Sequence, residues 1–396
     1  MKSLIFLLLA VLAKLGSSLD VTVARSYAVR QYTLLSQQLS NDDPSSGFIT
    51  TANPLNAYWD KNDVTRWTVG FYGGSLWTLY KLTRDNYWRN LALEFQERVK
   101  ERQYDTNTHD VGFVIMSTFG LCLEYTTGNE NIAVPVITQA AASLASRFYP
   151  LARVLRSWNN DEGHGGVPGE VKVIADNMMN LELLFKAAEL TGDRIFSDIA
   201  VSHANRTIEE HFRPDGGTFH VVAYNETTGN VQRKYNWQGL RDNSTWARGI
   251  SWVIHGYITS YQKSNGTFPR FLEYAEIAAN YFITRLPPDF VPYWDFDADF
   301  ETTYQPRDTS AAAIAAHGLL TLYTVTGNQT YFDTAEKIME NLISEKYRSD
   351  GKPEYKVSSI FVNGTVFYHE RNTNTAIVYG DFYFLQALDL YIELTQ

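Results

Sequence analysis

The chain has 396 residues, of which 44% are hydrophobic, 14% are aromatic and 20% are charged. This composition excludes a disordered or collagen-like chain, and the length allows either several domains or one large barrel. The single cysteine, Cys122, excludes an intrachain disulfide framework and a cysteine-based zinc cluster. Acidic residues outnumber basic ones by 44 to 34, which argues against binding to nucleic acid or to a membrane surface.

Residues 1–18 have the pattern of a secretory signal peptide. A basic start at Lys2 precedes an apolar run from Leu4 to Ala13, and small residues follow it. The run is shorter than the roughly 20 residues that span a bilayer, so the pattern favours export over a membrane anchor. We therefore expect a secreted, extracellular protein whose remaining residues, 19–396, form a single domain.

Six Asn-x-Ser/Thr tripeptides agree with export, because this tripeptide is the acceptor for N-glycosylation. They begin at Asn205, Asn225, Asn243, Asn265, Asn328 and Asn363. Five of them stand in polar or turn-like surroundings, whereas Asn243 lies inside a motif of the candidate site described below. Together the six tripeptides favour a eukaryotic secretory route and a glycoprotein.

An apolar segment that ends in a turn signal recurs along the chain. The turn signals end near residues 85, 129, 193, 266, 328 and 395. Glycine after an apolar periodic run ends a helix, and the Asn or Asp beside it can cap the next one. Each of the first five signals precedes an amphipathic stretch, such as 131–149, where Ile137, Ala141 and Leu144 recur at helical spacing. The segments before the signals, such as 176–190, are apolar on nearly every side, which is typical of buried helices.

Each unit is therefore predicted to be a buried helix, a tight turn and a half-exposed helix. The sixth buried helix has no partner after it, and a helix near residues 21–40 can supply one. Six inner and six outer helices that close on themselves form an all-α (α/α)6 barrel. An open helical solenoid is the alternative, but solenoid repeats usually keep a stricter period than these units, which long loops interrupt.

Polar and aromatic residues precede each predicted inner helix. They are Arg66-Trp67, His109-Asp110, Asp176-Asn177, residues 242–246, residues 307–310 and residues 371–375. In such a barrel all the inner helices begin at one end, where their partial positive charge favours an anion. Aromatic rings at the same end offer flat faces to a sugar. The sequence therefore predicts a pocket for an acidic carbohydrate.

Asp110 and Asp176 each stand at the start of a predicted inner helix. One interpretation is N-capping, for which aspartate is well suited. The other is a pair of carboxyl groups in which burial and like charge raise the pKa of one member toward neutrality. The two interpretations are compatible, since a capping residue can also face the pocket.

Further motifs follow one another in a fixed order over about residues 60–390. They are His109–Phe113, Gly165–Gly169 with Ala175–Leu181, Thr218–Val222 with Gln238-Gly239, Ser244–Trp252, Arg307–Ala313 and Tyr379–Phe384. Together they resemble the unsaturated glucuronyl hydrolases, glycoside hydrolase family 88. The resemblance implies a single (α/α)6-barrel catalytic domain over residues 19–396, in agreement with the helical pattern.

The resemblance also implies a reaction without a cofactor. Its substrates are the oligosaccharides that polysaccharide lyases leave with a 4,5-unsaturated uronic acid at the non-reducing end. Protonation at C4 creates an oxocarbenium ion at C5, water adds there, and the resulting hemiketal opens and releases the sugar. One carboxyl group can give the proton and then activate the water. This route differs from the usual scheme of two carboxylates that act at C1.

By the same resemblance, Asp176 is the catalytic acid and base, and Asp110 is the second carboxylate, which holds ring hydroxyls. Substrate-binding positions are expected at Trp67, His109, His220, Gln238, Trp246, Arg248, Trp252 and Arg371. His109 is the weakest of these, because a single histidine is more often a structural residue than a ligand-binding one. No histidine and carboxylate spacing predicts a metal site, and His203 and His211 fall on an outer helix.

Two other functions are compatible with such a barrel. An unsaturated rhamnogalacturonyl hydrolase acting on pectin fragments would share the barrel, but His220, Gln238 and residues 244–249 fit the glucuronyl family better. A non-catalytic carbohydrate-binding barrel would have no need of Asp176. The loop 363–375, where such enzymes meet the second sugar, contains Arg371 but no lysine, so the sequence leaves a preference for sulfate open.

Overall fold

The computed structural model describes residues 19–43, 46–159, 165–299 and 305–396. The predicted signal peptide, residues 1–18, lies outside the described residues. In the described ranges, no helix combines the length and the hydropathy that crossing a membrane requires.

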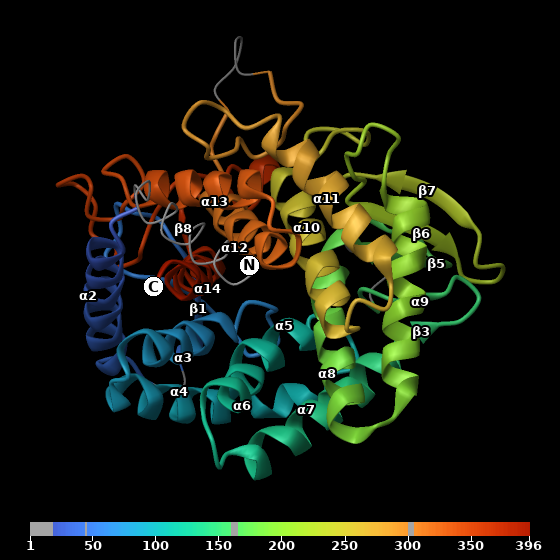
Figure 1. The fold of residues 1–396 in the computed structure, drawn as a ribbon, viewed down its shortest axis with the longest axis horizontal. Coiled ribbons are helices and arrows are strands. Elements are labelled where there is room, and N and C mark those ends of the chain that lie inside the picture. Colours follow the sequence, from blue (N-terminus) through green and yellow to red (C-terminus); the bar gives the residue numbers. More distant parts are fainter. Residues whose placement is uncertain (1–18, 44–45, 160–164, 300–304) are drawn as a thin grey trace, which may run out of the picture.

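Twelve helical units of the described chain form two concentric rings (Figure 1). The inner units are α3 (Phe71–Thr83), α5 (Val111–Ile115) continued by η3 (Met116–Gly120) and α6 (Leu121–Tyr125), η5 (Ala175–Asn180) continued by α8 (Leu181–Thr191), α10 (Ala247–Lys263), α12 (Thr309–Thr326) and α14 (Val378–Thr395). The outer helices are α2 (Val21–Ser40), α4 (Asn86–Val99), α7 (Glu130–Ala145), α9 (Arg194–His211), α11 (Pro269–Ile283) and α13 (Gln329–Leu342). The inner helices alternate with the outer ones along the chain, so the predicted (α/α)6 barrel is confirmed.

The predicted turn signals end the inner helices as expected. Gly192 ends α8 with a φ of 74°, and Gly327 ends α12 with a φ of 66°. Both angles lie in the left-handed region, which glycine adopts without a steric penalty. The side chain of Asp193 then caps α9, and that of Asn328 caps α13. Two residues thus reverse the chain between an inner and an outer helix.

The N-terminal helix closes the ring. Helix α2 packs against α14, the last inner helix, and α14 packs against α3, the first one. Hydrogen bonds also join α2 to α3: the Tyr32 hydroxyl donates to Ser75 Oγ at 2.9 Å, and Ser36 Oγ lies 2.9 Å from the Tyr72 hydroxyl. The prediction that residues 21–40 supply the sixth outer helix is therefore confirmed.

Short strands extend the barrel at the end where the inner helices begin. Strands β5 (Glu170–Ile174), β6 (Val221–Asn225) and β7 (Val231–Tyr235) form an antiparallel sheet, which lies beside α9 in Figure 1. Strand β1 (Phe48–Ala52) pairs with β2 (Asp60–Asn62) and with β8 (Ala376–Ile377). A third pair joins β3 (Phe148–Tyr149) to β4 (Val154–Leu155).

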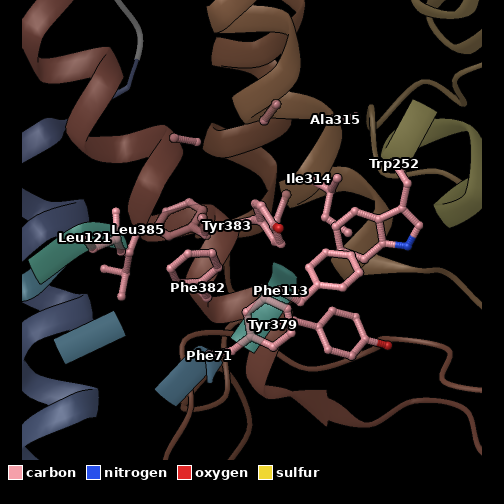
Figure 2. Packing of buried hydrophobic residues seen from close by; sticks show 14 of the residues in the cluster. Phe71, Phe113, Leu121, Trp252, Ile314, Ala315, Tyr379, Phe382, Tyr383 and Leu385 are labelled. Atoms are coloured by element: carbon pink, nitrogen blue, oxygen red, sulfur yellow. The ribbon is translucent and has the colours of Figure 1, made fainter. Parts of the chain in front are cut away.

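An aromatic layer fills the axis of the barrel. Figure 2 shows Phe71, Phe113, Trp252, Tyr379 and Tyr383 pointing toward one another from four different inner helices. The ring centres of Phe113 and Trp252 are 5.1 Å apart, and those of Trp252 and Tyr383 are 5.2 Å apart. Tilted and edge-on contacts at such distances suit the quadrupoles of aromatic rings. The layer separates the end where the inner helices begin from the end where they stop.

Candidate active site

The helices that carry the two candidate catalytic aspartates are held close together. Asp110 directly precedes α5, and Asp176 is the second residue of η5. The backbone N–H of Phe113 donates a hydrogen bond to Asn180 Oδ1 at 2.8 Å. A Cβ atom on Gly112 would lie 2.7 Å from Asn180 Cα, so only glycine permits this approach. Gly112 and Asn180 therefore set the spacing of the two aspartates.

Asp110 is an ionised carboxylate with local donors. It is 8% exposed, and the Thr108 hydroxyl donates a hydrogen bond to its Oδ2 at 2.6 Å. His109 Nε2 lies 3.2 Å from its Oδ1. Burial raises the pKa of Asp110, but His109, Thr108 and Arg102 together outweigh burial and lower the pKa below its usual value. The side chain makes no capping hydrogen bond to α5, so the capping interpretation is wrong for Asp110.

Asp176 differs from Asp110, because its pKa is raised. Its side chain does not cap η5 either, because the capping position is Ile174. The residue is 7% exposed, and its Oδ2 is buried without a hydrogen bond from any described residue. Burial raises the pKa of Asp176 to about 7, and the charge of Asp110 adds to the rise, while His109 and Arg248 oppose it. The two carboxyl groups thus differ in charge near neutral pH.

The sheet places His220 beside Asp176. Strands β5 and β6 pair with Ile174 opposite Val221, so Ala175 and His220 stand at the end of the ladder, where Ala175 N donates to His220 O at 2.9 Å. His220 Nε2 then lies 3.7 Å from Asp176 Oδ2. The ring of His220 also contacts the Trp246 ring, with 4.7 Å between ring centres.

Arg248 is a buried anchor rather than an exposed cation. Its guanidinium lies 2.6 Å from Asp308 Oδ2 and donates to the carbonyl of Val366 at 2.8 Å and to that of Thr365. It also donates to Gln238 Oε1 at 3.2 Å. Arg248 therefore fixes Gln238 and the loop 363–375 relative to α10 and α12.

The tryptophans Trp67 and Trp252, both predicted to bind the substrate, differ in exposure. Trp67 is half-buried, and its ring centre is 4.8 Å from that of Tyr379. Trp252 is 0% exposed and lies in the aromatic layer, edge-on to Trp67 at 6.4 Å. The expectation that Trp252 is a substrate-binding residue is therefore corrected: its ring is fully buried, fills the barrel axis and contacts the ring of Trp67.

The loop 363–375 forms one side of this end of the barrel. Its Tyr368 stacks on Trp294 with 4.0 Å between ring centres, and its His369 Nε2 lies 2.8 Å from the carbonyl oxygen of Gly239. Arg371 is exposed, and its side chain forms no hydrogen bond or ion pair with a residue that the structure describes. Its charge is therefore available to an anionic group.

The predicted site residues thus gather at one end of the barrel, but with unequal exposure. Of the eight predicted substrate-binding residues, Trp67 and Gln238 are half-buried and Arg371 is exposed. The other five are buried: His109, His220, Trp246, Arg248 and Trp252. Sequence reasoning gave no role to Thr108, Asn180, Asp308 or Tyr379, although the last three lie inside the quoted motifs. Their polar or aromatic type next to an inner-helix start was the signal that could have found them.

In the described ranges, no three His, Cys, Asp or Glu side chains converge as a set of metal ligands. His203 and His211 are buried in α9, and burial lowers the pKa of both. Leu155 N donates a hydrogen bond to His203 Nδ1 at 3.0 Å, and His211 Nδ1 lies 3.0 Å from the carbonyl oxygen of Phe219. Both histidines are therefore structural.

A helical double ring with two unlike carboxyl groups among aromatic rings defines a carbohydrate-active enzyme. Comparison with known proteins specifies the family: residues 41–394 match the sequence model of Glycosyl Hydrolase Family 88. An unsaturated glucuronyl hydrolase of Formosa agariphila is 40% identical over 332 residues, which are 81% of this chain and 79% of that protein. An unsaturated chondroitin disaccharide hydrolase of Streptococcus pneumoniae is 30% identical over 93% of this chain and 91% of its own length.

A solved structure extends the likeness to three dimensions. The crystal structure of an unsaturated glucuronyl hydrolase specific for heparin superposes with a TM-score of 0.85 at 32% identity, over 94% of this chain and 97% of that one. The chain therefore belongs to glycoside hydrolase family 88, and it is a glycoside hydrolase. This finding agrees with the resemblance in the sequence motifs. It supports neither of the two alternatives, the rhamnogalacturonyl hydrolase and the non-catalytic carbohydrate-binding barrel.

Proposed function

We propose that the protein releases 4,5-unsaturated glucuronic acid from the non-reducing end of oligosaccharides that polysaccharide lyases produce. The observation that carries this proposal is the pair of carboxyl groups, with Asp176 at a pKa of about 7 next to an ionised Asp110. One group is a proton donor near neutral pH, and the other accepts hydrogen bonds from sugar hydroxyls.

The reaction uses one carboxyl group twice. Protonated Asp176 gives its proton to C4, and the double-bond electrons form the new C–H bond, which leaves a positive charge shared by C5 and the ring oxygen. A water oxygen then adds to C5 while the Asp176 carboxylate takes a proton from that water. The hemiketal at C5 opens, and the glycosidic bond breaks as the product rearranges. Asp176 ends in its starting state, and one water is consumed.

The surroundings suit an anionic substrate. The inner helices begin at this end, so their partial positive charge favours the uronate carboxylate. Trp67 offers a half-buried aromatic face for the sugar ring. Relatives support the substrate class, since one solved structure with 26% identity is named as a complex with dGlcA-GalNAc6S and another as a complex with dGlcA-Glc-Rha-Glc.

The test is a panel of lyase-generated disaccharides from chondroitin, heparin and pectin, each with and without sulfate where both exist. Loss of the ultraviolet absorbance of the conjugated double bond reports turnover. The wild type is expected to turn over the glucuronyl substrates, and the absorbance should stay nearly constant with the Asp176→Asn variant. Asp198→Asn, on the exposed side of α9, is the matched control and should react like the wild type. Turnover of the pectin disaccharides alone would contradict the proposal.

We further propose that the protein is secreted as a glycoprotein. Residues 1–18 and the six acceptor tripeptides support this route. Asn243, Asn265 and Asn328 are exposed, whereas Asn205 lies inside α9 and donates a hydrogen bond to the carbonyl oxygen of Val201 at 3.0 Å. Expression in a eukaryotic cell should give a medium fraction that begins near residue 19 and loses mass with peptide N-glycosidase. Asn205 should carry the least glycan, and retention of the whole chain inside the cell would refute the proposal.

A further inference from the structure

A cavity lies at the end of the barrel opposite the two catalytic aspartates. It encloses about 280 Å³ and extends from Phe71 and Phe113, on the far side of the aromatic layer, to the last turns of the inner helices at Tyr125, Lys263 and Glu393. Asp110 and Asp176 do not line it. The mechanism proposed above makes no use of this cavity.

The helices that surround the cavity favour positive charge inside it. Units α6, α8, α10, α12 and α14 all end on this side, where the unsatisfied carbonyl groups of a helix carry partial negative charge. The same parallel alignment that makes the catalytic end attractive to anions therefore makes this end attractive to cations.

Acidic side chains exceed basic ones around the cavity. Lys81 forms an ion pair with Glu393 at 2.9 Å, and Lys263 forms one with Glu182 at 3.1 Å. These pairs neutralise two carboxylates, and the lining contains two more carboxyl groups, Glu124 and Asp389.

Asp389 is the unusual member of the lining. It is 9% exposed, and its side chain forms neither a hydrogen bond nor an ion pair with any residue in the described part of the chain. Burial raises the pKa of Asp389 to about 7; Glu393 and Glu124 add to the rise, while Lys81 and Arg84 oppose it. A buried carboxyl group without a partner is costly unless a ligand supplies one.

The deeper wall offers aromatic faces and neutral histidines. Phe382 and Tyr383 line the cavity, and aromatic faces attract cations. His255 Nε2 lies 2.6 Å from His317 Nδ1, and burial lowers the pKa of both rings, so neither adds a positive charge near neutral pH.

We infer that this cavity binds a small organic cation, whose ammonium group pairs with the Asp389 carboxylate while its apolar part lies against Phe382 and Tyr383. In the described ranges, no three His, Cys, Asp or Glu side chains converge as metal ligands, which favours an alkylammonium group over a metal ion. The inference is independent of the reaction proposed for Asp176.

The test compares three probes of the same shape, pentylammonium, pentan-1-ol and pentanoate, by titration calorimetry on the full chain. Pentylammonium is expected to bind about tenfold more tightly than pentanol, as a charged hydrogen bond predicts, and pentanoate least tightly. Asp389→Asn should remove the preference for pentylammonium while turnover of the unsaturated disaccharide stays unchanged. Its circular dichroism and melting temperature check that it folds.

Asp176→Asn separates this site from the catalytic end, and it should bind pentylammonium like the wild type. Equal affinity for pentanol and pentylammonium, or unchanged binding in Asp389→Asn, would overturn the inference. Loss of binding in Asp176→Asn would place the cation among the catalytic carboxyl groups and would overturn it as well. Failure of every probe to saturate would mean that the cavity holds solvent only, and it would also overturn the inference.

Discussion

Asp176→Asn tests the central feature of the site, a carboxyl group that is protonated near neutral pH. The amide keeps the size of the side chain but has no acidic proton to give to C4. Loss of a positioned acid and base lowers kcat/KM by about 10²- to 10⁴-fold, or about 3–5 kcal/mol of transition-state stabilisation. Because burial is the main cause of the raised pKa of Asp176, the amide should fold as well as the acid.

The dependence of the wild-type kcat/KM on pH tests the raised pKa of Asp176 independently of the variant. With a pKa of about 7, Asp176 is about nine-tenths protonated at pH 6 and about one-tenth at pH 8. Asp110, with its lowered pKa, stays ionised over this range. Therefore kcat/KM should fall about tenfold from pH 6 to pH 8. Initial rates from the loss of ultraviolet absorbance at low substrate concentration measure it. A flat profile, or an Asp176→Asn variant within threefold of wild type, would refute the reasoning.

Three further predictions follow from the described contacts, and a fourth from the proposed reaction. Gly112→Ala should lower the free energy of unfolding by about 1–3 kcal/mol in a denaturant titration, because its Cβ would clash with Asn180; unchanged stability would contradict the close approach. Arg248→Lys should lower the free energy of unfolding by about 3 kcal/mol and raise KM more than it lowers kcat, because lysine cannot bond to Asp308 and to the loop 363–375 at once. Wild-type unfolding and wild-type kinetics in this variant would exclude the anchoring role. Asp389→Asn should raise the melting temperature at pH 8 and have little effect at pH 4. Because the pKa of Asp389 is raised, the native state binds the proton more tightly than the unfolded state does, so the wild type loses stability as pH rises from about 4 through about 7. A variant that melts below wild type at pH 8 would show that the ionised carboxylate is stabilising. Reaction in ¹⁸O-water, quenched early, should label the C5 carbonyl of the product, and label at C1 of the released sugar would indicate ordinary glycoside hydrolysis.

Local patterns in the sequence determined the architecture. A helix that is buried on all sides must be apolar on all sides, and a tight reversal needs glycine followed by a capping residue. Both requirements are visible in residues close together in the chain, such as the run before Gly192 and the cap at Asp193. The barrel, its helix order and the end that carries the site follow from those local rules, and the motifs indicated the family.

The tertiary structure alone decided the chemical state of each site residue. Asp110 and Asp176 occupy similar positions in sequence, yet one has a lowered pKa and the other a raised one, because Thr108 and His109 serve the first while Oδ2 of the second is buried without a donor. Such differences depend on which groups approach from distant segments. Which residues stand at the helix starts can be read from the sequence, but their solvation and hydrogen bonds arise only when strands and loops pack around them.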